Sequence, residues 1–201
     1  MGPSVQGSSI SRAARIRLSA TIAATFVAGA TLFFALVHVL SRWSGLADYS
    51  DNTRAGAGAV GLLLLAALDL RARRRKTYCP VGLRRQTPKS LIHRRSPTFV
   101  AAAWGLDIGL AFTTIRVTAL TWGAVLLAGL GLSGLFAGLW YGLAFALPFV
   151  LLLWTHRVGR ASRSAEPLDP GLESMLARRG TLQAGSAALL ATSAVVLLVV
   201  G

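Results

Sequence analysis

Residues 117–155 read VTALTWGAVLLAGLGLSGLFAGLWYGLAFALPFVLLLWT, a run of 39 residues without Asp, Glu, Lys, Arg or His. One straight helix of this length would measure about 58 Å, at ~1.5 Å per residue. The hydrocarbon core of a bilayer is only about 30 Å thick. The run therefore holds two apolar helices, or one helix and part of another. We assign the two segments to Val117–Leu132 and Leu135–Trp154, separated by Ser133 and Gly134.

The composition of the whole chain also indicates a membrane protein. Hydrophobic residues make up 54% of it and charged residues 14%, against about 25% charged residues in soluble domains. The sequence predicts an all-α, polytopic integral membrane helix bundle of six apolar helical segments. Residues 1–18 form a polar, basic N-terminal tail, and residues 19–201 form a single transmembrane domain. The four further apolar segments are residues 18–41, 55–70, 98–114 and 181–200.

The basic residues are concentrated in one loop. The net charge is +14, and residues 71–96 contain ten Lys and Arg without an acid. Positively charged loops stay in the cytoplasm and face anionic lipid headgroups. The N-terminal tail is also basic, so we expect it on the same side, in a multi-pass protein of a bacterial inner membrane. Because the basic residues flank apolar segments, we exclude nucleic acid as a partner.

The number of crossings stays open at five or six. Six crossings would place residues 156–180, with five arginines and three acids, on the outside. Five crossings require residues 98–132 to form a single pass with a break near residues 112–116. The distribution of positive charge favours five crossings, whereas the segment lengths favour six. A broken helix is tolerated in a membrane where its free backbone groups face protein or water.

Four polar residues near this break form the candidate substrate-binding site: Asp107, Thr113, Thr114 and Arg116. Charges at membrane depth are costly, so they usually face the bundle interior and often have a role. The alternative is that Arg116 marks a helix end at the membrane interface and that Asp107 is satisfied locally. Asp69 lies beside the basic loop, where we expect it to neutralise an arginine.

Catalytic and metal-binding patterns are absent from the sequence. Cys79 is the only cysteine, so no internal disulfide can form, and the three histidines lie in separate segments. Residues 56–61 match the pattern G-x-G-x-x-G, but no strand precedes them. We therefore predict no cofactor, no metal and no catalytic residue, and a membrane enzyme is the least favoured of three function classes. The repeats Gly105/Gly109 and Gly134/Gly138/Gly142 instead predict helices that approach closely.

The C-terminal half resembles the second repeat of the CcdA/DsbD family of transmembrane electron carriers. The motifs that carry this resemblance are Gly109-Leu110, Thr113-Thr114, Leu132-Ser133-Gly134, Tyr141-Gly142 and Leu147-Pro148. The resemblance implies a carrier or transporter, with a membrane or thioredoxin-like protein as a possible partner. The family's pair of redox cysteines is missing, and thiol exchange needs a second sulfur. The alternative function is a non-catalytic membrane scaffold or assembly subunit.

Overall fold

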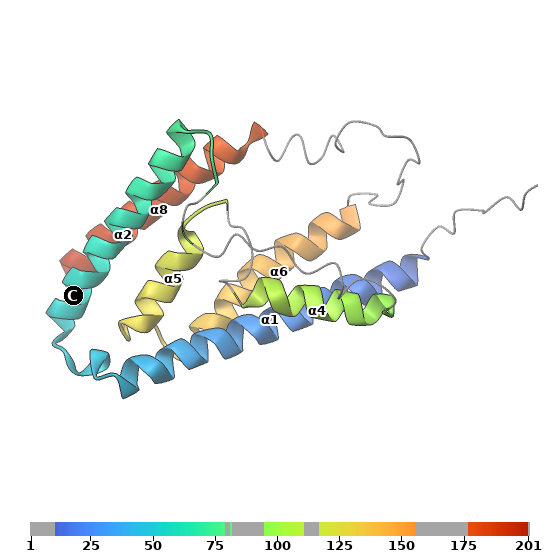
Figure 1. The fold of residues 1–201 in the computed structure, drawn as a ribbon, viewed down its shortest axis with the longest axis horizontal. Coiled ribbons are helices and arrows are strands. Elements are labelled where there is room, and N and C mark those ends of the chain that lie inside the picture. Colours follow the sequence, from blue (N-terminus) through green and yellow to red (C-terminus); the bar gives the residue numbers. More distant parts are fainter. Residues whose placement is uncertain (1–10, 79–80, 82–94, 111–116, 156–176, 201) are drawn as a thin grey trace, which may run out of the picture.

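A computed structural model describes residues 11–78, 81, 95–110, 117–155 and 177–200. Six α-helices and one short 3-10 helix form its regular structure, with no strand in these ranges (Figure 1). The prediction of six helical segments is confirmed for this part of the chain. Helix α1 starts inside the stretch assigned to the polar tail. The elements are α1 (Arg12–Trp43), η1 (Leu46–Asp48), α2 (Asp51–Arg74), α4 (Pro97–Gly109), α5 (Leu120–Gly129), α6 (Ala137–Thr155) and α8 (Arg179–Val200).

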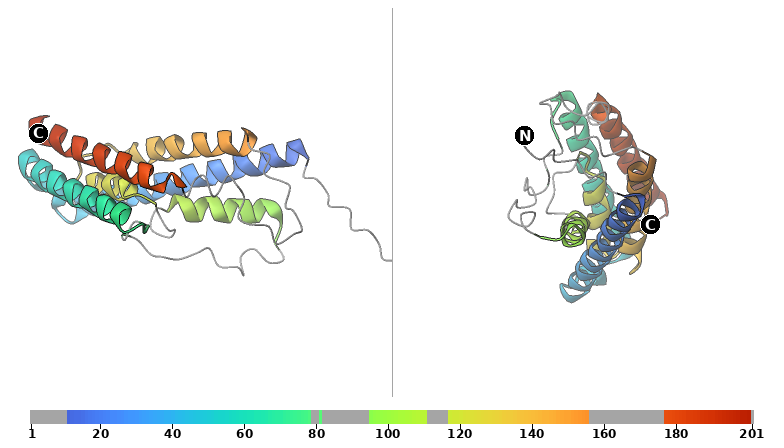
Figure 2. Two further views of the ribbon diagram at one scale, coloured as in Figure 1. Left: turned by 90° about the horizontal axis from the view of Figure 1, so that it is seen from above. Right: turned by 90° about the vertical axis from the view of Figure 1, so that its right-hand side faces the viewer.

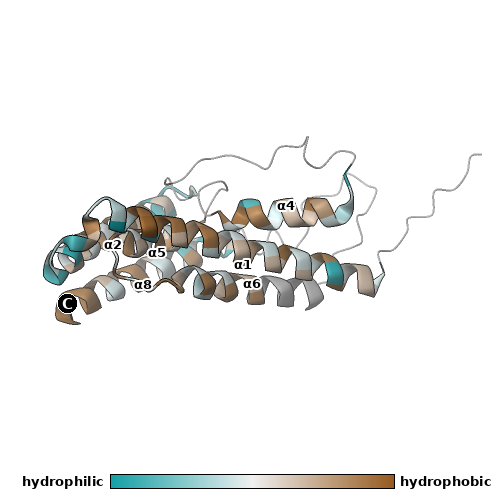
Figure 3. Ribbon diagram, turned by 90° about the horizontal axis from the view of Figure 1, so that it is seen from below, coloured by the Kyte–Doolittle hydropathy of each residue, from teal (hydrophilic) through white to brown (hydrophobic). Residues whose placement is uncertain are grey.

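Three helices are long and apolar enough to cross a membrane: α1 from Ile16 onward, α2 and α8. In Figure 3 these helices carry hydrophobic colour along much of their length, including the C-terminal end of α8. Eleven of the fifteen buried hydrophobic residues are alanines, whereas many Leu, Val and Trp side chains are exposed. Small residues inside and large apolar residues outside are typical of helices that pack in lipid. Six crossings are not confirmed.

The helices form two packed groups with α5 between them. Helices α2 and α8 lie side by side, and α4 and α6 both pack on α1 (Figure 1). Figure 2 shows, from above, that α4 and α6 contact α1 from different sides. Helix α5 contacts α1, α2 and α8. This short helix therefore joins the two groups.

Glycines allow the backbones of α4 and α6 to approach α1, as the sequence predicts. A Cβ atom on Gly105 would lie 2.4 Å from the carbonyl oxygen of Ile22, and one on Gly109 would lie 2.5 Å from that of Phe26. On α6, a Cβ on Gly138 would lie 2.8 Å from the carbonyl oxygen of Ala30. A larger residue would force these helices apart. Gly134, the first member of its repeat, has open space around it.

These contacts also fix the direction of each helix. Gly105 and then Gly109 meet successively later residues of α1, so α4 runs parallel to α1. Helix α5 runs antiparallel to α2, because Ala119 at its start bonds Asp69 and Leu130 at its end bonds Arg54. Figure 1 shows that α2 turns back at an angle from the end of α1, so these two helices run in broadly opposite directions. Helices α4 and α5 therefore run in the same direction along the bundle.

Residues 98–132 do not form one continuous helix. Helix α4 ends at Gly109, before the predicted break at Phe112–Val117, and α5 begins at Leu120. At ~1.5 Å per residue, α4 is about 20 Å long and α5 about 15 Å, so neither alone spans a hydrocarbon core of about 30 Å. Residues 111–116, which contain most of the predicted break, lie outside the described residues.

Candidate functional site at the start of helix α5

Helix α5 has no cap of its own at its N-terminus. Helices α1, α2 and α4 each begin after a serine, Ser11, Ser50 or Ser96, whose hydroxyl accepts a backbone N–H of the first turn. The N-cap residue of α5 is Ala119, which has no side-chain oxygen to do this. The first N–H groups of a helix need partners. For α5 the partner comes from another helix.

Asp69 of α2 supplies this partner. The amide N–H of Ala119 donates to both carboxylate oxygens of Asp69, at 2.9 Å and 3.0 Å. The hydroxyl of Ser186 on α8 donates to Oδ2 of the same carboxylate. Asp69 is fully buried and Ser186 almost so. A single carboxylate thus joins three elements inside the bundle.

Gln183 extends this polar cluster by one turn of α8. Its Nε2 donates to the carbonyl oxygens of Thr77, at 2.9 Å, and Val117, at 3.2 Å. Gln183 is also fully buried, and its Oε1 has no hydrogen-bond partner among the described residues. The cluster of Asp69, Gln183 and Ser186 therefore uses its side-chain donors and leaves an acceptor vacant. We call these three residues the buried polar cluster.

Two further bonds hold the start of α5 in place. The indole N–H of Trp122 donates to the carbonyl oxygen of Val81, at 3.2 Å. The hydroxyl groups of Thr121 and Tyr141 lie 2.8 Å apart, which ties α5 to α6. The ring of Tyr141 also packs against Phe34 of α1, with a centroid distance of 5.1 Å. The first turn of α5 is therefore bonded to elements from both halves of the bundle.

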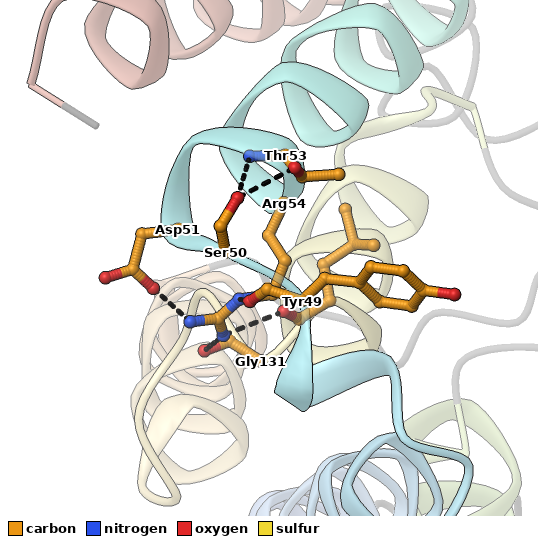
Figure 4. Close-up of polar contacts among 7 residues, drawn as sticks. Tyr49, Ser50, Asp51, Thr53, Arg54 and Gly131 are labelled. Carbon is orange, nitrogen blue, oxygen red and sulfur yellow. Dashed lines mark hydrogen bonds and ion pairs between the residues drawn. The ribbon is translucent and has the colours of Figure 1, made fainter.

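The other end of α5 is held by an arginine. Arg54, in the first turn of α2, donates from its Nη1 to the carbonyl oxygens of Leu130 and Gly131, each at 3.3 Å. Figure 4 shows its guanidinium between these carbonyls and the carboxylate of Asp51, with which it forms an ion pair. Its Nε also donates to the carbonyl oxygen of Tyr49, at 3.1 Å. One side chain thus caps the C-terminal end of α5.

Two of the charged residues of α2 match the dipole of α5. A helix carries about half a positive charge at its N-terminus and half a negative charge at its C-terminus. Asp69 lies at the first of these ends and Arg54 at the second. They are about 22 Å apart along α2, at ~1.5 Å per residue. The antiparallel arrangement therefore lets one long helix stabilise both ends of a short one.

The structure describes one of the four residues predicted to bind a substrate. Asp107 lies in the last turn of α4 and is partly buried. Thr113, Thr114 and Arg116 lie outside the described residues, so the predicted site stays a prediction. Among the described residues, no group of three or more His, Cys, Asp or Glu side chains could hold a metal ion.

The expected role of Asp69 is wrong. Its carboxylate points into the bundle and accepts from Ala119 and Ser186, whereas Arg71 and Arg73 beside it are exposed. An acid two residues before a basic run can face either the bundle or its surroundings, and the sequence did not reveal which. Sequence reasoning missed Gln183 and Ser186. Their signal was their spacing of three, which places two polar side chains on one face of an apolar helix.

Comparison with known protein families, curated proteins and solved structures finds no match for this chain.

Proposed function

We propose that this protein is a multi-pass membrane carrier whose binding site lies at the buried polar cluster. The observation that supports this most is the buried carboxylate of Asp69 at the start of α5. Ionisable groups inside a membrane are costly and usually functional. Transporters bind their substrates and coupling ions at the ends of such half-helices.

The proposed topology has five crossings, with α4 and α5 together as one interrupted pass. The parallel direction of these two helices supports it, because a six-crossing protein needs them to run oppositely. In this arrangement the N-terminal tail and residues 71–96 and 156–180 all connect to the same end of the bundle. These are the basic segments of the chain. We therefore place this end in the cytoplasm, as the positive-inside rule favours.

The vacant group of the cluster indicates the chemistry of the cargo. The amide of Gln183 donates both of its hydrogens to carbonyls, and the hydroxyl of Ser186 donates to Asp69. The Oε1 of Gln183 and the carboxylate oxygens of Asp69 remain as acceptors for a ligand. Among the described residues of the cluster, an anion would find no free side-chain donor. The cluster suits a proton or a small solute with a cationic N–H donor.

The same arrangement agrees with the resemblance to CcdA/DsbD-like carriers. An interrupted pass in the C-terminal half is what that resemblance implies. Because Cys79 is the only cysteine, our proposal keeps the carrier architecture and omits dithiol chemistry. We expect Cys79→Ser to leave transport unchanged. Loss of transport in that variant would instead indicate a thiol partner in another protein.

Transport is tested with the purified chain in liposomes loaded with a pH-sensitive dye. A potassium gradient with valinomycin drives proton uptake, and radiolabelled methylammonium serves as the second probe. We expect at least one probe to enter faster than into protein-free liposomes. Asp69→Asn removes the charge but keeps the shape, and it should reduce this uptake at least tenfold. The matched control is Asp51→Asn, which changes an exposed carboxylate on the same helix. Equal uptake in Asp69→Asn and the parent would contradict the proposed site.

Cys79 offers a separate test of the topology. It lies within residues 71–96, which the five-crossing proposal places in the cytoplasm. A membrane-impermeant maleimide should therefore label it only after the cells are opened. A cysteine introduced at Gly45, between α1 and η1, should be labelled in intact cells. The opposite pattern would invert the proposed orientation.

A membrane scaffold is the second candidate function. It is favoured by the fact that Asp69 accepts the N–H of Ala119 and the hydroxyl of Ser186, so a structural role alone accounts for its burial. In that case Asp69→Asn would lower the stability of the protein, and neither probe would enter the liposomes faster than the protein-free background. If liposomes that contain the well-folded parent protein take up neither probe, the scaffold function is favoured.

A further inference from the structure

We infer that the cytoplasmic end of α2 holds the phosphate headgroup of an anionic membrane lipid. An open pocket of about 450 Å³ lies there, lined by Ala67, Leu70, Arg71, Arg74 and Arg75. These positions recur at the spacing of helix turns, so they share one face of α2. The two apolar residues lie deeper in the helix, and the three arginines lie at its end. This order matches a lipid whose acyl chains contact the two apolar residues and whose phosphate contacts the arginines.

The pocket lies on the opposite face of α2 from the buried polar cluster. At about 100° per residue, Arg74 points roughly 140° away from Asp69. All five lining residues are exposed. Asp69 and its neighbour Ala66 are buried. The site therefore faces the surroundings of the bundle and is separate from the proposed transport site.

The three arginines are available to a ligand. Among the described residues, no carboxylate forms an ion pair with Arg71, Arg74 or Arg75. They are also not required to cap the helix. The N–H groups of Lys76 and Thr77 already bond the carbonyls of Arg73 and Ala72, at 3.1 Å and 2.9 Å. Guanidinium groups bind phosphate with paired hydrogen bonds, and basic clusters at this depth bind anionic headgroups.

Arg73 provides a matched control on the same helix turn. It is absent from the pocket lining, and a Cβ on Gly180 of α8 would lie 3.9 Å from its Cγ. Arg73 therefore faces α8 and carries the same charge as the pocket residues. A variant of Arg73 changes the net charge of this end of the protein without touching the pocket.

The test measures binding of phosphatidylglycerol to the full chain in detergent by native mass spectrometry. Each basic residue near an anionic lipid surface contributes about a factor of five to binding. We expect Arg71→Gln combined with Arg74→Gln to weaken the first bound lipid about 30-fold. Arg73→Gln should weaken it less than threefold. Ala67→Trp, which fills the apolar floor at unchanged charge, should also weaken it. Circular dichroism checks that each variant keeps its helix content.

Three results would overturn the inference. The first is equal binding of phosphatidylcholine, whose headgroup has no net charge. The second is a loss of about fivefold in Arg73→Gln, as large as in Arg71→Gln or Arg74→Gln alone, which would indicate a general charge effect. The third is displacement of the lipid by millimolar inorganic phosphate, which would indicate a site for soluble phosphate. Failure of transport in liposomes has no bearing on this result, because lipid binding is measured directly.

Discussion

The two ends of helix α5 are held by the same neighbour in different surroundings. At the N-terminal end, Asp69 is fully buried and bonded by Ala119 and Ser186. At the C-terminal end, the side chain of Arg54 is 16% exposed and pairs with Asp51, whose side chain is 79% exposed. A buried group without its partner costs far more than an exposed one, because water replaces the lost bond only at the surface. The two ends should therefore differ in how much stability each contributes.

The two ends of α5 also differ in the role that their residues suggest. The C-terminal end uses an arginine that is partly exposed and pairs with the exposed carboxylate of Asp51. The N-terminal end places a carboxylate and a vacant acceptor, Oε1 of Gln183, where no water is accessible. The cost of burying these polar groups is offset either by a bound ligand or by the stability that their hydrogen bonds give to the fold. The variants below measure the contribution of each end.

The largest effect is expected from Asp69→Ala. This change leaves the N–H of Ala119 buried without a partner and removes the acceptor for Ser186. We expect the free energy of unfolding to fall by about 2–3 kcal/mol, measured by titration with SDS in mixed micelles. Asp69→Asn should lose less, because its amide oxygen still accepts the N–H of Ala119. A loss below about 0.5 kcal/mol in Asp69→Ala would show that the buried end is no stronger than a surface contact.

The second effect concerns Gln183→Leu. Leucine fills a similar volume but cannot donate to the carbonyls of Thr77 and Val117. We expect a loss of about 1–2 kcal/mol in the same titration. Thr181→Val, at an exposed position two residues earlier, serves as the control and should stay within ~0.5 kcal/mol of the parent. An unchanged stability in Gln183→Leu would mean that those carbonyls find other partners.

A smaller effect is expected from Arg54→Gln at the C-terminal end. It removes the ion pair with Asp51 and weakens the cap on Leu130 and Gly131. We expect a loss of about 1 kcal/mol, which should shrink as salt is raised, because exposed charges are screened. The loss in Asp69→Ala should not depend on salt. Equal salt dependence at both ends would contradict the contrast in burial.

The smallest effect is expected from Asp51→Asn. Its carboxylate is exposed and pairs only at the surface, so its contribution should be at most about 0.5 kcal/mol. This variant also serves as the control for charge removal in the transport assay. A loss as large as that of Arg54→Gln would show that the ion pair, rather than the bonds to carbonyls, holds this end of α5.

Much of the fold was predictable because it depends on local patterns. Long apolar runs form helices in any membrane arrangement, since no other structure satisfies their backbone within one segment. The six segments therefore agree with the six helices to within a few residues, apart from the early start of α1 and the early end of α4 at Gly109. The glycine repeats also predicted close packing, which Gly105, Gly109 and Gly138 confirm. The exact position at which α4 ends, Gly109, could not be predicted from the local sequence.

The sequence by itself determined that the chain forms apolar helices suited to a membrane, with its basic residues beside their ends. Only the tertiary structure decided that α4 and α5 run in the same direction, and that Asp69 faces inward toward Ala119 and Ser186. Hydrophobicity and charge are properties of single residues and their near neighbours. The partner of a buried carboxylate lies 50 or 117 residues away along the chain, and only packing brings such residues together.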